Sequence, residues 1–274
     1  MAPDPRHRHA WDGRPTRDLV ELYLTDPESD EGGQALAVIH YRGGAEEFAH
    51  GARLARGASE KERVAGADIL AQLGWGERTH LEDSVAILLQ LLHDSSEDVV
   101  SAAAIALGHR NHPRAIQPLV ELSGHPNPEV RYGVVHGLSE HDDVSAIAAL
   151  IRLASDPDRD VRNWATFGIA QQTDLDSPKI REALLARTED DDSEIRGEAL
   201  LGLARRGDAR VLPLVRRELS GEFHGDWAVE AAELLAHPSL YPLLEALQLR
   251  LEPEDHVRFE QSFSDALRSC KPSR

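Results

Sequence analysis

Cysteine is almost absent from this chain, which contains the single thiol of Cys270 among 274 residues. One thiol excludes an internal disulfide and a cysteine-based metal cluster, and it suits a reducing compartment, so we expect a cytoplasmic protein. The N-terminal residues lack the apolar core of a signal peptide, and no apolar run approaches the length of a membrane span. We therefore expect no membrane partner.

Positive charge is also scarce. Thirty Lys and Arg residues stand against 48 Asp and Glu residues, which gives a formal net charge of -18. Binding to the phosphate backbone of nucleic acids needs clustered cations, so we expect no general nucleic-acid affinity. An acidic surface instead attracts basic proteins and accelerates their association. The charge balance thus favours a protein partner that is basic.

Motifs for catalysis or cofactor binding are absent from the sequence. We find no nucleophile-base motif, no phosphate-binding glycine loop and no paired catalytic carboxylates. The 14 histidines form no His-Glu dipeptide, and His112, His125 and His237 each precede proline in turns. His109 and His136 could approach each other, but two histidines without carboxylates do not make a metal site. We expect no cofactor and no metal, and the absence of these motifs favours a non-catalytic protein over an enzyme.

The acidic run Glu189–Glu194 is open to two interpretations. Carboxylates just before a helix favour its N-terminal dipole, so the run is interpreted mainly as helix capping. An acidic rim that receives a basic partner is the alternative.

A helix-forming segment recurs along the chain with a near-constant period. The ninth residues of its copies, Leu73, Leu107, Leu138, Ile169, Leu203 and Leu235, are separated by 34, 31, 31, 34 and 32 residues. At 100° per residue, offsets 0, +4 and +8 of each copy form one apolar stripe. Small residues at offset +7, such as Gly137 and Gly202, would let neighbouring helices approach closely. The repeat predicts an all-α superhelix, a solenoid of stacked antiparallel helix pairs.

The same pattern divides the chain into four parts. We predict a flexible leader at 1–15, an N-terminal helical cap at 16–58, repeats at 59–238 and a C-terminal helical cap at 239–274. Ser59 with Glu62, and Thr79 with Glu82, have the spacing of capping boxes and should start two helices.

An acid followed five residues later by an apolar-arginine pair carries a family resemblance. It occurs at Asp156 with Val161-Arg162, at Asp190 with Ile195-Arg196, and at Val130-Arg131 with His125 in place of the acid. The pattern resembles HEAT repeats, in particular the short kind found in phycobilin-lyase-like proteins. Three further segments are similar to actinobacterial HEAT-repeat proteins: GADILAQLG, VRNWATFGIA and DSPKIREALL. The segment LGWGERTH does not share this similarity. The resemblance implies an acid-arginine ladder between repeats, in which Asp94, followed by Val99-Val100, would lack its arginine.

The face opposite the buried stripe holds apolar residues where solvent should favour charge. We predict that it forms a partner-binding strip on the concave surface. An alternative is that curvature buries this row between successive helices, with the Trp164 indole filling space beside Gly133 or Gly197. The predicted strip consists of Ile105, Tyr132, His136, Asn163, Trp164, Phe167, Leu201 and Arg205.

These features favour a non-catalytic scaffold or adaptor that binds a protein partner on its concave surface. An inhibitor or immunity protein that covers the active site of a basic toxin is the concrete version of this hypothesis. The resemblance also allows a bilin lyase, with His136, Tyr132 and Trp164 contacting the tetrapyrrole. A HEAT-like DNA-repair glycosylase is a further alternative, but its basic groove would need the arginines that the ladder uses.

Overall fold

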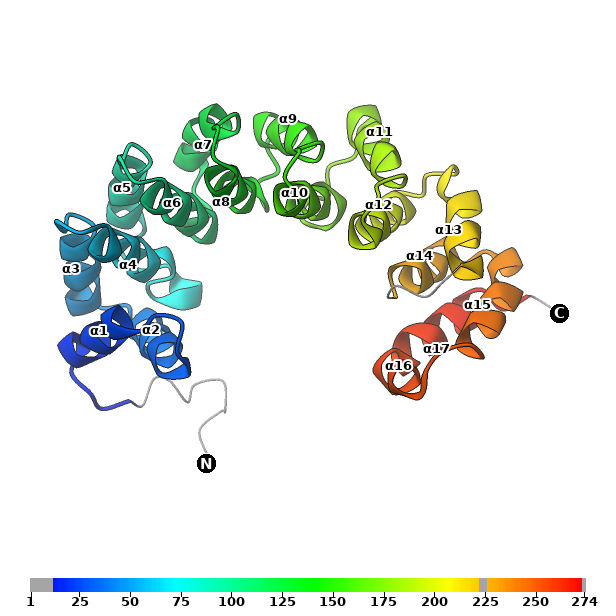
Figure 1. The fold of residues 1–274 in the computed structure, drawn as a ribbon, viewed down its shortest axis with the longest axis horizontal. Helices are drawn as coiled ribbons and strands as arrows, with labels where there is room; N and C mark the ends of the chain where they lie inside the picture. Colours follow the sequence, from blue (N-terminus) through cyan, green and yellow to red (C-terminus); the bar gives the residue numbers. More distant parts are fainter. Residues whose placement is uncertain (1–11, 222–225, 273–274) are drawn as a thin grey trace. The chain divides into compact units, whose positions relative to one another are not determined.

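The computed structural model describes residues 12–221 and 226–272, and within these ranges it contains helices and no β-strand. Residues 1–11 of the predicted leader lie outside the described residues, whereas the carbonyls of Asp12 and Arg14 accept hydrogen bonds from Arg42. The chain divides into two compact units, Met1–Ala146 and Ile147–Arg274 (Figure 1). None of the described helices has the length and apolar character needed to span a bilayer.

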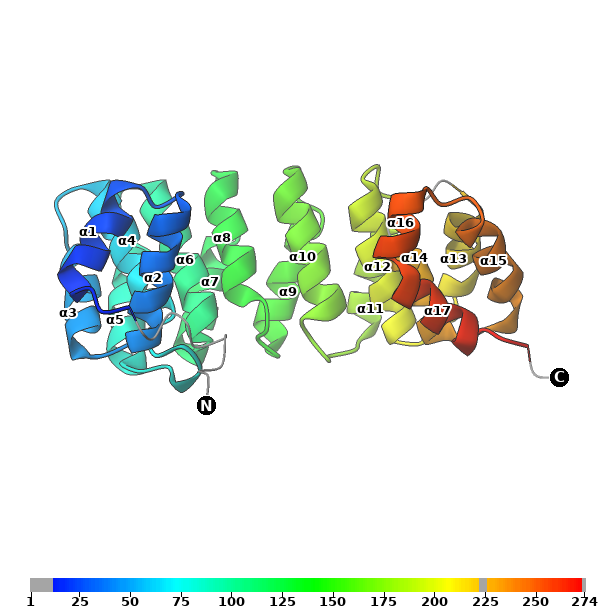
Figure 2. The same ribbon diagram turned by 90° about the horizontal axis from the view of Figure 1, so that it is seen from below.

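The first unit is a stack of antiparallel helix pairs. The inner helices α4, α6 and α8 pack on one another in order, and the outer helices α3, α5 and α7 pack on them (Figures 1 and 2). Helices α1 and α2 form a pair at the N-terminal end, within the predicted cap. The helices are α1 Thr16–Thr25, α2 Asp30–Arg42, α3 Ala45–Leu54, α4 Glu60–Ala71, α5 Leu81–Leu91, α6 Glu97–Arg110, α7 Ile116–Leu122 and α8 Pro128–Leu138. Helix α9, Val144–Leu153, spans the division between the units.

The second unit repeats this arrangement. Its inner helices α10, α12, α14 and α17 pack in that order, and α17 takes the inner position beside α14 (Figure 2). Helices α11, α13 and α15 form the outer row, and α16 precedes α17. The bounds are α10 Arg159–Gln171, α11 Pro178–Arg187, α12 Ser193–Arg205, α13 Val211–Ser220, α14 Trp227–Leu235, α15 Tyr241–Gln248, α16 Pro253–Arg258 and α17 Glu260–Ser269.

One of the two predicted capping boxes forms and the other does not. Ser59 accepts the backbone N–H of Glu62, whose carboxylate accepts the N–H of Ser59. The Thr79 box is wrong, because the Thr79 hydroxyl donates to the Gly43 carbonyl at 2.6 Å. Helix α5 instead begins after His80, which has a left-handed backbone and no side-chain cap. The tertiary hydrogen bond thus replaces the local one.

The apolar stripe and the close approach of helices are confirmed. Val130, Val134 and Leu138 at offsets 0, +4 and +8 of one copy are all fully buried. A Cβ on Gly137 would lie 2.7 Å from the carbonyl oxygen of Ala104 on α6. The two helix backbones are therefore in contact, as the small residue at offset +7 predicts.

The implied ladder forms a rung between successive repeats in each unit. Arg63 donates from Nε and Nη2 to both carboxylate oxygens of Asp94, at 2.7 and 2.9 Å. Arg162 donates in the same way to Asp190, at 2.9 and 3.4 Å. The expectation that Asp94 lacks an arginine is wrong, because its partner comes from the preceding repeat.

The rung that would follow Arg63–Asp94 along the chain is missing, because neither its arginine nor its acid is present. Val100 occupies the arginine position and His125 the acid position of the same rung. His125 Nδ1 still accepts the N–H of Asn127 at 3.2 Å, as Asp190 accepts the N–H of Asp192 at 3.2 Å. The histidine thus forms the same turn hydrogen bond as the acid does elsewhere. At the arginine position, the buried Val100 provides an apolar side chain in place of a charged one.

We expect the Arg162–Asp190 pair to contribute a coupling energy of about 1–2 kcal/mol, because it is forked and mostly shielded from water. A double-mutant cycle with Arg162→Met and Asp190→Asn, followed by urea unfolding, measures this energy. The exposed pair Arg217–Glu189 is the matched control and should give less than about 0.5 kcal/mol. Equal coupling in the two cycles would contradict a structural role for the ladder.

Candidate partner-binding site

The eight residues of the predicted strip fall into two groups, one in each unit. In the first unit Ile105 on α6 and Tyr132 and His136 on α8 are all half-buried. The rings of Tyr132 and His136, one helical turn apart, lie with centroids 4.5 Å apart and planes tilted by 58°. Burial, and secondarily the charge of His109, lowers the pKa of His136. This group presents a compact aromatic pair rather than an ionic site.

In the second unit, the predicted residues on α10 differ in exposure. Trp164 is 39% exposed and makes an edge-to-face contact with Phe167, with ring centroids 5.6 Å apart. Asn163 is buried, and its Oδ1 has no hydrogen-bond partner among the described residues. Trp164 and Phe167 are therefore the residues of this group that can reach a partner.

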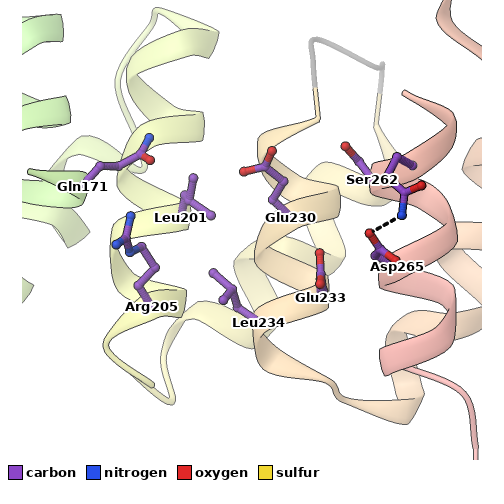
Figure 3. A pocket seen from close by; sticks show the side chains of 9 residues that line it. Gln171, Leu201, Arg205, Glu230, Glu233, Leu234, Ser262 and Asp265 are labelled. Carbon is purple, nitrogen blue, oxygen red and sulfur yellow. Dashed lines mark hydrogen bonds between the residues drawn. The ribbon is translucent and has the colours of Figure 1, made fainter. Parts of the chain in front are cut away.

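The remaining predicted residues, Leu201 and Arg205 on α12, line a cleft of about 480 Å³ in the second unit (Figure 3). We call this the acidic cleft. Leu201 is only 5% exposed and forms part of its wall, while Arg205 is exposed at its edge. Gln171, on α10, is one turn after Phe167 and shares its face of the helix. The acidic cleft is lined by Gln171, Leu201, Arg205, Glu230, Glu233, Leu234, Gln261, Ser262 and Asp265.

Carboxylates dominate the far wall of the acidic cleft. Figure 3 shows Glu230 and Glu233 on α14 and Asp265 on α17, opposite Arg205. Asp265 pairs with Arg268 at 2.8 Å, whereas neither glutamate forms an ion pair within the described part of the chain. Burial raises the pKa of Glu230, and the nearby charges of Asp226, Glu198 and Glu233 raise it further. The two glutamates of this wall therefore have no neutralising cation within the described residues.

A polar group behind the acidic cleft connects three inner helices. Glu198 on α12 accepts hydrogen bonds from the Gln171 amide and from the Trp227 indole N–H, the latter at 3.0 Å. Burial raises the pKa of Glu198. The Trp227 ring lies against Gly197, where a Cβ would be 2.6 Å away. The indole beside Gly197 is thus that of Trp227 and not, as the sequence allowed, that of Trp164.

Sequence reasoning identified part of the acidic cleft and missed the rest. Glu233 shares offset +6 with Phe167 and Leu201, so the helical wheel does place it on the inner face. The contributions of α17, Ser262 and Asp265, carry no such signal because α17 does not follow the repeat. Within the described ranges, no three His, Cys, Asp or Glu side chains are grouped so that they could hold a metal ion.

Comparison with known proteins agrees with this architecture. The family model for HEAT repeats matches residues 51–124, 85–170 and 153–236, which together span most of the chain. A search of curated proteins gives no match.

Solved structures of the same fold include the Escherichia coli protein YibA, which is 26% identical with a TM-score of 0.70; the match covers 95% of this chain and 93% of YibA. An engineered protein, 17% identical, matches over 93% of this chain and 78% of its own, with a TM-score of 0.53. A repeat scaffold of this kind suggests a role in protein interaction.

Proposed function

Because the chain belongs to the HEAT-repeat family, we propose that it is a non-catalytic interaction module that holds a basic segment of a protein partner in the acidic cleft. The observation that carries the proposal is the pair Glu230 and Glu233, which have no ion pair within the described ranges. A guanidinium or ammonium group from a partner would neutralise this wall. The inhibitor hypothesis is the version in which the basic segment belongs to a toxin.

The apolar lining of the acidic cleft supports the same kind of partner. Leu234 on α14 is 50% exposed, and Leu201 forms part of the wall. Arginine and lysine side chains combine a charged head with an apolar stem, so one side chain can contact the leucines and the glutamates together. Phe167, one turn from Gln171 on α10, extends this surface with an aromatic group suited to a binding hot spot.

Selection of displayed random peptides of about twelve residues tests the proposal without knowledge of the natural partner. We expect the selected peptides to be rich in Lys and Arg, and their affinity to fall as salt rises from about 50 to about 500 mM. The double variant Glu230→Gln/Glu233→Gln should bind them about tenfold or more weakly in fluorescence anisotropy, and Phe167→Ala should show a comparable loss.

Two exposed acids of the same unit provide the matched control. Asp174→Asn/Asp191→Asn removes the same charge from residues that do not line the acidic cleft. We expect this variant to bind within about twofold of the parent protein, because it changes only long-range attraction. Peptides without a basic bias, or equal losses in both double variants, would rule out the acidic cleft as the binding site.

A further inference from the structure

A strained segment interrupts the repeat between α4 and α5. Within LGWGERTH, three non-glycine residues, Trp75, Arg78 and His80, have φ values of 43°, 49° and 51°, and Gly74 has φ 71°. A left-handed backbone is unfavourable for residues with a side chain and persists only where surrounding contacts enforce it. Such strain concentrates at functional sites, so the segment is a candidate for a role that packing does not explain.

Contacts with neighbouring helices hold this segment in place. The Gly74 N–H donates to the His40 carbonyl at 2.8 Å, and Arg110 Nη1 donates to the Leu73 carbonyl at 3.1 Å. The Trp75 ring stacks on Tyr41 with centroids 5.8 Å apart and planes within 11°. The indole nevertheless remains 53% exposed. The result is a preorganised aromatic platform that offers surface to solvent.

The platform borders a second cleft, of about 400 Å³, which we call the Trp75 cleft. It is lined by Ala71, Gln72, Trp75, Gly76, Arg78, His109 and Arg110. No carboxylate is among these residues, although the chain as a whole carries a net charge of -18. Glu77, the acid of the same segment, is not part of the lining.

Two arginines are among the residues that line the Trp75 cleft. Arg78 is exposed at its surface, and Arg110 lies fully buried behind it. Burial, and secondarily the charge of Arg78, lowers the pKa of Arg110 to about 10. Arg110 is held by the carbonyls of Leu70 and Leu73 and by the Ser84 hydroxyl, none of which is an anion. A bound anion would offset the repulsion between the two guanidinium groups.

We propose that the Trp75 cleft binds a small ligand in which a flat ring carries an anionic group. The ring lies on Trp75, and the anion is bound by Arg78 with the buried charge of Arg110 behind it. The volume falls within the usual range for small-molecule sites and accommodates a ligand as large as a mononucleotide. Phosphate and carboxylate share this chemistry, because arginine recognises both. The site is separate from the acidic cleft and does not depend on the proposed function.

Calorimetric titration of the full chain tests the ring and the anion separately. AMP is compared with adenosine and inorganic phosphate, and benzoate with benzamide. We expect AMP or benzoate to bind at least about tenfold more tightly than each of its comparison compounds. The compound that gains more affinity over its own neutral counterpart identifies the anion as phosphate or carboxylate.

Two variants remove the proposed contacts without adding backbone strain. Arg78→Asn and Trp75→Asn place asparagine, which tolerates the left-handed conformation, at these positions. Each should weaken binding at least about tenfold with an unchanged circular dichroism spectrum, while Arg216→Asn on the exposed side of α13 should not.

The proposal is overturned if neither anion binds below about 10 mM, if the neutral compounds bind as well, or if Arg78→Asn binds like the parent. Peptide binding in the acidic cleft is expected to survive Arg78→Asn and Trp75→Asn, so failure of one site is distinguishable from failure of the other.

Discussion

Replacement of Gly137 by valine is expected to lower the free energy of unfolding by about 3 kcal/mol. A Cβ at this position would lie 2.7 Å from the Ala104 carbonyl oxygen and 2.8 Å from a methyl carbon of Leu119. Gly108 on α6 faces the same contact, since its Cβ would lie 3.1 Å from Gly137 Cα. Neither helix has room for a side chain, so valine must separate α6 from α8 and loosen their packing.

Urea unfolding monitored by circular dichroism measures this effect. The control is Gly124→Val, because nothing lies within 4 Å of a Cβ on Gly124. We expect the control to change the free energy of unfolding by no more than about 0.5 kcal/mol. If both valine variants are equally stable, the contact between the α6 and α8 backbones does not limit the stability of the first unit.

The second large effect is a loss of stability at acidic pH that depends on His40. This side chain is 4% exposed, and its Nε2 donates to the Asp68 carbonyl at 2.8 Å. Burial, together with the charge of Arg110, lowers the pKa of His40 from 6.5 to about 4. The unfolded chain therefore takes up the proton first as the pH falls. The stabilisation is complete above pH 6.5 and is lost between pH 6.5 and about 4, with a total of about 3 kcal/mol.

His40→Gln isolates this contribution, because its amide can still donate to the Asp68 carbonyl but does not titrate. We expect the wild-type protein to lose about 3 kcal/mol more than His40→Gln between pH 7 and pH 4 in urea unfolding. Both proteins contain the same carboxylates, so the contribution of these groups to the pH dependence of stability cancels in the comparison. His93→Gln alters an exposed histidine and should keep the wild-type pH dependence. A His40→Gln protein that loses stability as the wild type does would show that other groups govern acid unfolding.

Most of the fold could be predicted from helical periodicity in the sequence. The stripe through Val130, Val134 and Leu138 depends only on the angle between successive residues, so it could be predicted without knowledge of any neighbour. The capping box at Ser59 is local in the same sense. The box at Thr79 is wrong because the hydroxyl reaches Gly43, just after α2, a partner 36 residues away that no local pattern reveals.

The candidate site was less accessible to the same reasoning. A helical wheel places Phe167, Leu201 and Glu233 on one face, but it does not tell which faces meet across the stack. The acidic cleft depends on α17, which takes an inner position without the repeat sequence, and the Trp75 cleft depends on a strained segment that departs from the repeat. Both arise from irregular elements, whose positions are determined by tertiary contacts rather than by period.

The direction of the ladder has a consequence for synthesis of the protein. Arg63 precedes its carboxylate, Asp94, by 31 residues, and Arg162 precedes Asp190 by 28. During translation, each of these arginines emerges from the ribosome before its acceptor does. A repeat that has just emerged therefore completes its rung only when the following repeat has emerged too. The nascent chain gains this source of order one repeat behind the ribosome, in the direction from the N-terminus to the C-terminus.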